Sequence, residues 1–258
     1  MGGMSEMNVA QLIDIDAKRT KTSNEVYQTS TMLALLDGIY DGVINFEELK
    51  ERGDFGIGTF DQLDGEMIAF DNEFYHLRSD GSAEKVELEE TTPFATVTFF
   101  EKEMSYTVER PMNREEVEAL LHELMPSKNL FYAIRMDGTF REVRTRTVPR
   151  QEKPYTPLVE VTKSQPIFSF KDTEGTLAGF WTPDYAQGIG VAGFHLHYID
   201  DERNGGGHVF DYVVENCTIQ ICQKSHMHLA LPETADFMAA ELSRENLEND
   251  IATAEGAE

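Results

Sequence analysis

The feature that most constrains the fold is a long succession of short strand-like segments between residues 66 and 223. Apolar and polar side chains alternate in these segments, and Gly, Pro, Asn or Asp separates them, as is typical of strands joined by turns. Many strands with few helices predict an α+β (mixed α/β) fold. We expect two sheet-containing domains, with largely antiparallel or mixed strands and a few flanking helices.

Local signals place the helices and one tight turn. A capping box formed by Asn113 and Glu116 begins a helix that ends before Pro126. The sequence Asp137-Gly138 between two alternating segments predicts a hairpin with strands at 129–136 and 139–148. Apolar spacing and capping residues predict further helices at residues 30–42, 46–52 and 234–249.

Prolines between residues 149 and 157 predict a boundary between two domains. The N-terminal α/β domain would comprise residues 23–150, and a β-rich C-terminal domain with a terminal helix and tail would comprise 151–258. Residues 1–22 are polar, and we expect a flexible N-terminal segment there.

Charge and apolar content exclude several function classes. The chain has 47 acidic and 22 basic residues, a net charge of −25, which disfavours binding to nucleic acid or an anionic membrane. Its apolar runs are far shorter than the about 20 residues of a membrane-spanning helix. We therefore expect a soluble, cytoplasmic protein. Cys217 and Cys222 lie on opposite faces of an alternating segment, so we expect packed thiols and no disulfide.

Three histidines are predicted to converge. His195 and His197 share one face of a strand, and the glycine-rich loop at 200–207 predicts that the strand starting at His208 runs back antiparallel. If Ile199 pairs with His208, all three imidazoles lie on one face. Such a set suits zinc or another borderline divalent ion, although three histidines on a polar sheet face are the alternative. The remaining histidines include the pair at 226 and 228, a weaker ligand candidate, and the isolated His76 and His122, for which we expect surface or core positions.

The only basic concentration lies near residue 146. Alternation places Glu142, Arg144 and Arg146 on one face of a strand, with Arg150 shortly after it. This face is either solvated or an anion clamp, because a guanidinium binds a carboxylate in bidentate fashion. A metal beside an arginine suggests a small carboxylate substrate.

Several motifs together resemble the alpha-acetolactate decarboxylase family, over roughly residues 20–256. They are Gly193-Phe-His-Leu-His197 with His208, Asp64-Gly-Glu-Met67, Gly58-Thr59-Phe60, and the segments 30–42, 129–140 and 145–151. The resemblance implies a carboxy-lyase that converts 2-acetolactate to acetoin and CO2. It also implies a zinc cofactor, which acts as electron sink for an enediolate intermediate, and a homodimer.

The resemblance also implies roles for individual residues. Zinc would be held by His195, His197 and His208. The active-site residues would be Arg146, Glu66, Thr59 and Glu255, with Glu248 as an alternative to Glu255. Arg146 would orient the substrate carboxylate, and Glu66 or Glu255 would deliver the proton that sets the chirality of the product.

Two other classes remain as alternatives. His195, His197 and Glu202 have the spacing of a cupin-type metalloenzyme, but a second cupin motif is absent and the helices are unexplained. A non-enzymatic DNA-associated domain of related fold is supported only by Arg144, Arg146 and Arg150, against the charge of −25. Replacing Glu202 by glutamine separates the cupin from the decarboxylase, because only the cupin would lose its metal.

Overall fold

Two β-sheets dominate the computed structural model, which describes residues 24–243 and 247–255; the segment predicted at residues 1–22 lies outside the described part. The first sheet has seven strands in the order β15-β1-β8-β3-β4-β5-β6. Its strands are β1 (Glu25–Thr29), β3 (Phe55–Thr59), β4 (Glu66–Phe70), β5 (Glu73–Leu77), β6 (Ala83–Lys85), β8 (Ala95–Thr98) and β15 (His226–Ala230). All of its pairings are antiparallel except β1 with β15.

The second sheet has the order β10-β14-β11-β12-β13, and β9 pairs with β14. Its strands are β9 (Met104–Val108), β10 (Met112–Asn113), β11 (Phe131–Arg146), β12 (Ile167–Thr182), β13 (Gly193–Asp200) and β14 (Gly206–Lys224). β13 also pairs with the start of β14, so β11 to β14 form a closed cycle of pairings. A small third sheet joins β2 (Ile44–Asn45) to β7 (Thr91–Thr92). The α+β class predicted from the strand pattern is confirmed.

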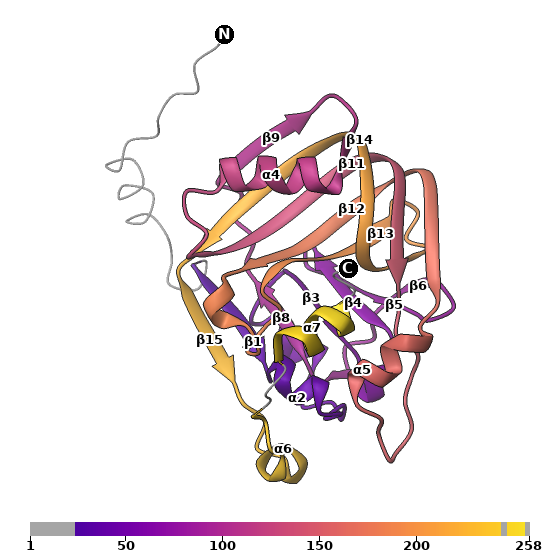
Figure 1. The fold of residues 1–258 in the computed structure, drawn as a ribbon, viewed down its shortest axis with the longest axis vertical. Coiled ribbons are helices and arrows are strands. Elements are labelled where there is room, and N and C mark those ends of the chain that lie inside the picture. Colours follow the sequence, from indigo (N-terminus) through magenta and orange to yellow (C-terminus); the bar gives the residue numbers. More distant parts are fainter. Residues whose placement is uncertain (1–23, 244–246, 256–258) are drawn as a thin grey trace.

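The two large sheets pack face to face (Figure 1). A shared core between them contains Phe55, Ile57 and Ile68 from the first sheet, with Phe180 and Ile199 from the second. The opposite face of the second sheet packs under helix α4 (Arg114–Leu124). The cysteines follow this division, because Cys217 lies in the α4 core and Cys222 in the shared core. Both are free, as their opposite faces predict.

Sheet membership crosses the boundary expected near residue 150. β11 precedes that boundary but lies in the second sheet, whereas β15 follows it and joins the first sheet beside β1. The division into domains at 23–150 and 151–258 therefore stays a prediction, and the sheets themselves interleave the two halves of the chain.

The hairpin predicted at Asp137-Gly138 is wrong. Both residues lie inside β11, which pairs with β12 on one side and β14 on the other. A Cβ atom on Gly138 would lie 2.2 Å from the carbonyl oxygen of Asn216, so glycine allows β14 to approach here. The Asp137 carboxylate accepts hydrogen bonds from Arg135 and Thr176, which ties it to the sheet instead of a turn.

Most helices are shorter than predicted. α4 keeps its predicted capping box. α2 (Met32–Leu36) stops early because Gly38 adopts a φ of +88°, and α3 (Phe46–Lys50) is equally short. The helix predicted at 234–249 is two helices, α6 (Ala235–Ala239) and α7 (Leu247–Glu255). The remaining short elements are α5 (Leu158–Val161), η1 (Asp61–Leu63), η2 (Thr162–Ser164) and η3 (Asp184–Ala186).

Helices α2, α5 and α7 pack together over one end of the two sheets (Figure 1). Their core includes Leu36, Leu158 and Ile251, all buried. Among the described helices, none is long and apolar enough to cross a membrane.

Candidate metal centre

Three histidines from two neighbouring strands converge between the sheets. His195 and His197 lie on β13, and His208 lies on β14 directly opposite His197. Gly206, not His208, pairs with Ile199, so the register differs from the expected one by two residues. A shift of two keeps every side chain on its face, and the predicted convergence is confirmed. One ligand nitrogen from each ring lies within 4.8 Å of the others.

The protonation of the rings suits metal binding. His197 Nδ1 lies 2.8 Å from the carbonyl oxygen of Met67 on β4, so this nitrogen carries the ring proton and donates a hydrogen bond to that oxygen. His197 Nε2 is then an acceptor, and it is buried without a hydrogen-bond partner among the described residues. Burial lowers the pKa of His197 well below its usual value. Burial, helped by the charge of Arg146, lowers the pKa of His195 to about 3. Both rings are therefore neutral at pH 7, the form that binds divalent metals.

Arg146 is the arginine that lines the same site. It pairs with His208 across β11 and β14, which places both side chains on one face of the sheet. The guanidinium is buried, and its Nη2 donates a hydrogen bond to the carbonyl oxygen of Ala254 in α7. Arg144 instead lies over the ring of Phe210. The predicted arginine face therefore contributes a single cation to this site.

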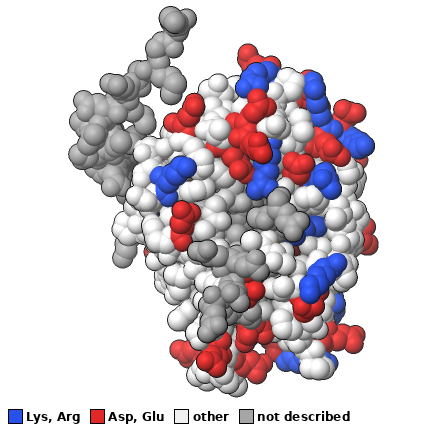
Figure 2. Space-filling view, in the orientation of Figure 1, with Lys and Arg blue, Asp and Glu red and all other residues white. Residues whose placement is uncertain are grey.

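Arg150 also lies away from the histidines, where it donates to the side chain of Gln62. On the face shown in Figure 2, basic side chains are interspersed with acidic ones. The cluster of Arg144, Arg146 and Arg150 that supported a DNA-associated domain is thus dispersed into separate contacts.

Thr59 and Glu66 reach the site from the first sheet. They are directly opposed partners at the ends of β3 and β4, so their side chains share a face. Thr59 Oγ1 donates a hydrogen bond of 2.6 Å to the carbonyl oxygen of Gly65. Glu66 Oε2 lies 3.7 Å from His197 Nε2, and its side chain is only 13% exposed. The structure therefore brings a carboxyl group next to the unpartnered histidine nitrogen.

A cavity of about 50 Å³ joins these groups. Its polar wall contains the three histidines, Arg146, Thr59 and Glu66. The apolar part of its lining consists of Met32, Leu35, Leu63, Phe94, Val148 and Leu158. Sequence reasoning assigned Met32 and Leu35 only to a helix core and missed their role in the cavity. Their helical spacing marks a buried face but does not reveal that this face borders a cavity.

Helix α7 contributes to the lining of this cavity. Ala254 of α7 belongs to the lining, and Ile251 is buried one turn before it. Glu255 and Glu248 both lie in α7, but their side chains are outside the described part of the structure. Their predicted roles therefore stay predictions.

The remaining candidate ligands lie elsewhere. Glu202 is exposed in the turn between β13 and β14, where it accepts a hydrogen bond from Asn204. His228 lies on β15 near Glu25, with 3.9 Å between Nδ1 and Oε1. Within the described residues, the ligand geometry groups neither of them with another two metal-binding side chains. The support for a cupin-type site, which needs Glu202, is therefore lost.

Comparison with known proteins gives a consistent result. Residues 26–244 match the family model described as alpha-acetolactate decarboxylase. An alpha-acetolactate decarboxylase of Bacillus licheniformis is 54% identical, over 99% of each chain. One of Methanosarcina mazei is 47% identical, over 90% of this chain and 81% of its own. A crystal structure of the Bacillus subtilis alpha-acetolactate decarboxylase superposes with a TM-score of 0.88 at 55% identity, covering 90% of this chain and 99% of the other.

Proposed function

The chain belongs to the alpha-acetolactate decarboxylase family and is a carboxy-lyase, and on that premise we propose that it decarboxylates 2-acetolactate to acetoin and CO2 with a zinc ion at His195, His197 and His208. One observation carries the metal part of this proposal. The buried Nε2 of His197 has no hydrogen-bond partner among the described residues, although it lies beside two further imidazoles. Such a nitrogen is costly to bury unless a cation or a donor binds it.

The donor set fits zinc. Neutral imidazole nitrogens are preferred zinc ligands, and three protein ligands leave a coordination position open. The contact between His197 Nδ1 and the Met67 carbonyl fixes the orientation of the ring, as is usual for metal-binding histidines. A bound divalent ion supplies a Lewis acid, which stabilises negative charge that develops on the oxygen atoms of the substrate.

Arg146 binds and orients the substrate carboxylate. Its guanidinium is held inside the cavity by the Ala254 carbonyl, and it stays protonated at any physiological pH. The apolar side chains of the same lining limit the access of water to the bound anion. An anionic substrate of a protein with a net charge of −25 needs such a local positive group.

Glu66 supplies the proton. Loss of CO2 breaks one carbon–carbon bond and leaves its electron pair on the remaining skeleton, so one proton must be added to reach acetoin. Glu66 lies at the cavity next to His197, where its carboxyl group can deliver that proton to one face. The Thr59 hydroxyl donates a hydrogen bond to the carbonyl oxygen of Gly65 and so fixes the backbone next to Glu66. Glu255, or Glu248 in its place, is the second acid of the proposal and comes from α7.

Incubation of the purified protein with racemic 2-acetolactate tests the function directly. Acetoin, CO2 and the metal content are measured on the same sample, before and after treatment with a chelator. We expect acetoin formation that falls with the metal content and returns when zinc is added. Full turnover after complete removal of the metal would refute the zinc proposal, and failure to form acetoin with metal present would refute the substrate.

Arg146→Lys is expected to raise KM about 30-fold. Lysine keeps the positive charge but lacks the planar fork, so one charge-assisted hydrogen bond to the carboxylate is lost, which costs about 2 kcal/mol. Steady-state kinetics with 2-acetolactate measure the change, and Arg144→Lys is the matched control because Arg144 lies over Phe210 outside the cavity. An unchanged KM in Arg146→Lys would contradict the carboxylate contact.

Location and assembly are also part of the proposal. The two free cysteines are consistent with a reducing compartment, which supports a cytoplasmic enzyme. A homodimer is implied by the family resemblance, and light scattering coupled to size-exclusion chromatography measures it. A monomeric mass at micromolar concentration would contradict the dimer.

A further inference from the structure

A single turn joins Thr59 to Glu66. It comprises residues 60–65 between β3 and β4, and it contains η1. Gln62 and Leu63 have φ values of +61° and +57°, which residues other than glycine rarely adopt. Such a backbone persists only where the surrounding structure holds it. The position of both proposed site residues therefore depends on whatever holds this turn.

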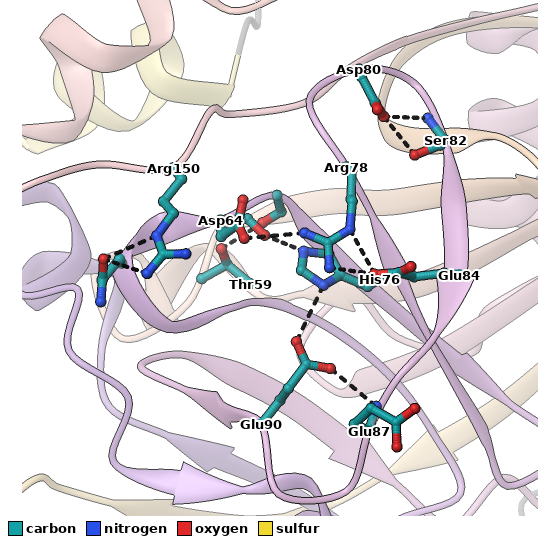
Figure 3. Close-up of polar contacts among 12 residues, drawn as sticks. Thr59, Asp64, His76, Arg78, Asp80, Ser82, Glu84, Glu87, Glu90 and Arg150 are labelled. Atoms are coloured by element: carbon teal, nitrogen blue, oxygen red, sulfur yellow. Dashed lines mark hydrogen bonds and ion pairs between the residues drawn. The ribbon is translucent and has the colours of Figure 1, made fainter.

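His76 on β5 contacts both ends of the turn, and its contact with Asp64 is seen in Figure 3. Its ring stacks on Phe60, with 3.5 Å between the ring centroids and 9° between the planes. Its Nε2 donates a hydrogen bond to the carbonyl oxygen of Asp64. Phe60 follows Thr59 directly, and Asp64 lies two residues before Glu66. The imidazole, which is 1% exposed, thus spans the turn that carries both residues.

His76 does not itself reach the cavity. It pairs with Met67 across β4 and β5, which places its side chain on the face opposite to that of Glu66. It lines instead a separate cleft of about 210 Å³ on the outer side of the turn, together with Asp64, Glu90 and Arg150. The turn is therefore a wall between this cleft and the cavity, and His76 supports it from outside.

Charged side chains lie close to the imidazole of His76, but burial favours its neutral form. Glu90 Oε1 lies 3.6 Å from Nδ1, and Arg78 forms an ion pair with Asp64 on the same side. Burial is the main influence and lowers the pKa of His76. The neutral ring with its proton on Nε2 is therefore the form that holds the Asp64 carbonyl.

We propose that His76 is a positioning residue for the decarboxylation: through Phe60 and the Asp64 carbonyl it fixes the turn that holds Thr59 and Glu66 at the cavity, with Glu66 beside His197. This inference rests on the proposed function, because it assigns His76 to the same site. It extends that function to a residue for which the sequence indicated only a surface or core position.

Two substitutions separate the contacts of His76. His76→Phe keeps a buried ring on Phe60 but removes the donor to Asp64. His76→Gln removes the ring but keeps an N–H donor at a similar reach. His122→Phe is the matched control, since His122 also packs against aromatic rings and has a buried Nδ1 without a hydrogen-bond partner in the described structure, but lies on α4. Metal content, kcat, KM and the enantiomeric excess of acetoin are measured for each protein.

We expect kcat of His76→Phe to fall about 30- to 100-fold, as is usual when a group that orients an active-site residue is lost. Its KM and metal content should stay within about threefold of the unmodified protein, because Arg146 and the histidines are untouched. The enantiomeric excess should fall as well, since a displaced Glu66 no longer protonates one face. His76→Gln should recover kcat to within about fivefold, and His122→Phe should match the unmodified protein.

Other results would overturn the proposal. His76→Phe with the kcat and enantiomeric excess of His122→Phe would show that the turn needs no support from Nε2. A larger loss in His76→Gln than in His76→Phe would show that the ring alone, and not the hydrogen bond to Asp64, supports the turn. Enantiomeric excess does not depend on the amount of active protein, so it still shows how Glu66 is placed in a variant of which only part is folded. Full kcat in Glu66→Gln would refute the role of Glu66 itself, whereas a normal His76→Phe beside an inactive Glu66→Gln refutes only the positioning role.

Discussion

His195→Ala is expected to remove the bound metal and to lower kcat/KM by at least about 10³-fold, which corresponds to about 4 kcal/mol of lost transition-state stabilisation. His195 belongs to the three-histidine group, and its Nε2 lies 3.1 Å from His208 Nδ1. Two imidazoles without the third leave the ion with too few histidine ligands to be retained. Metal analysis of the purified variant and steady-state kinetics with added zinc measure both effects.

Glu202→Gln is the control for this loss. Glu202 lies seven residues from His195 in the chain, but it is exposed and accepts a hydrogen bond from Asn204. The metal content and kcat/KM of the Glu202→Gln protein should therefore stay unchanged. Metal loss in Glu202→Gln would restore the cupin alternative. A His195→Ala protein with full metal content and full turnover would refute the three-histidine centre.

Glu66→Gln is expected to lower kcat about 10³-fold with a change in KM of less than about threefold, because a general acid contributes about 10² to 10⁴ to the rate. Glutamine keeps the size of the side chain and its place opposite Thr59 but cannot release a proton in this way. The acetoin that still forms should lose enantiomeric excess, since water then protonates either face. Kinetics and chiral gas chromatography measure the two effects.

Glu25→Gln provides the matched control for Glu66. Glu25 also lies beside a histidine in the same sheet, His228, but far along the sheet from the cavity. It should keep kcat and enantiomeric excess. Full kcat in Glu66→Gln together with a loss of kcat in Glu255→Gln or Glu248→Gln would assign the role of proton donor to a glutamate of α7.

The convergence of His195, His197 and His208 could be predicted from the sequence because its geometry is local. Two histidines at a spacing of two share a strand face, and one short reversal brings the third beside them. The error in register did no harm because it was even, so all three rings stayed on one face. The opposite faces of Cys217 and Cys222 were predictable for the same reason.

Features that depend on distant strands were not predictable. Asp137-Gly138 has the composition of a hairpin turn, but strands on both sides of β11 impose an extended conformation. The prediction that several arginines form one anion clamp was wrong, because local contacts, such as that of Arg144 with Phe210, direct each side chain separately. The contacts of His76 were hidden because its partners, Phe60 and Asp64, lie in the turn before β4 and meet β5 only once the strands pair.

The parallel pairing of β1 with β15 has a consequence for biosynthesis. Glu25 lies beside His226, so β1 emerges from the ribosome long before its outer partner has been translated. Pairings between such distant segments form slowly, because a long loop must close first. Arg146 likewise waits for Ala254, which lies 108 residues further along the chain. The newly made chain therefore completes the cavity beside the histidines only after α7 has been translated and has docked.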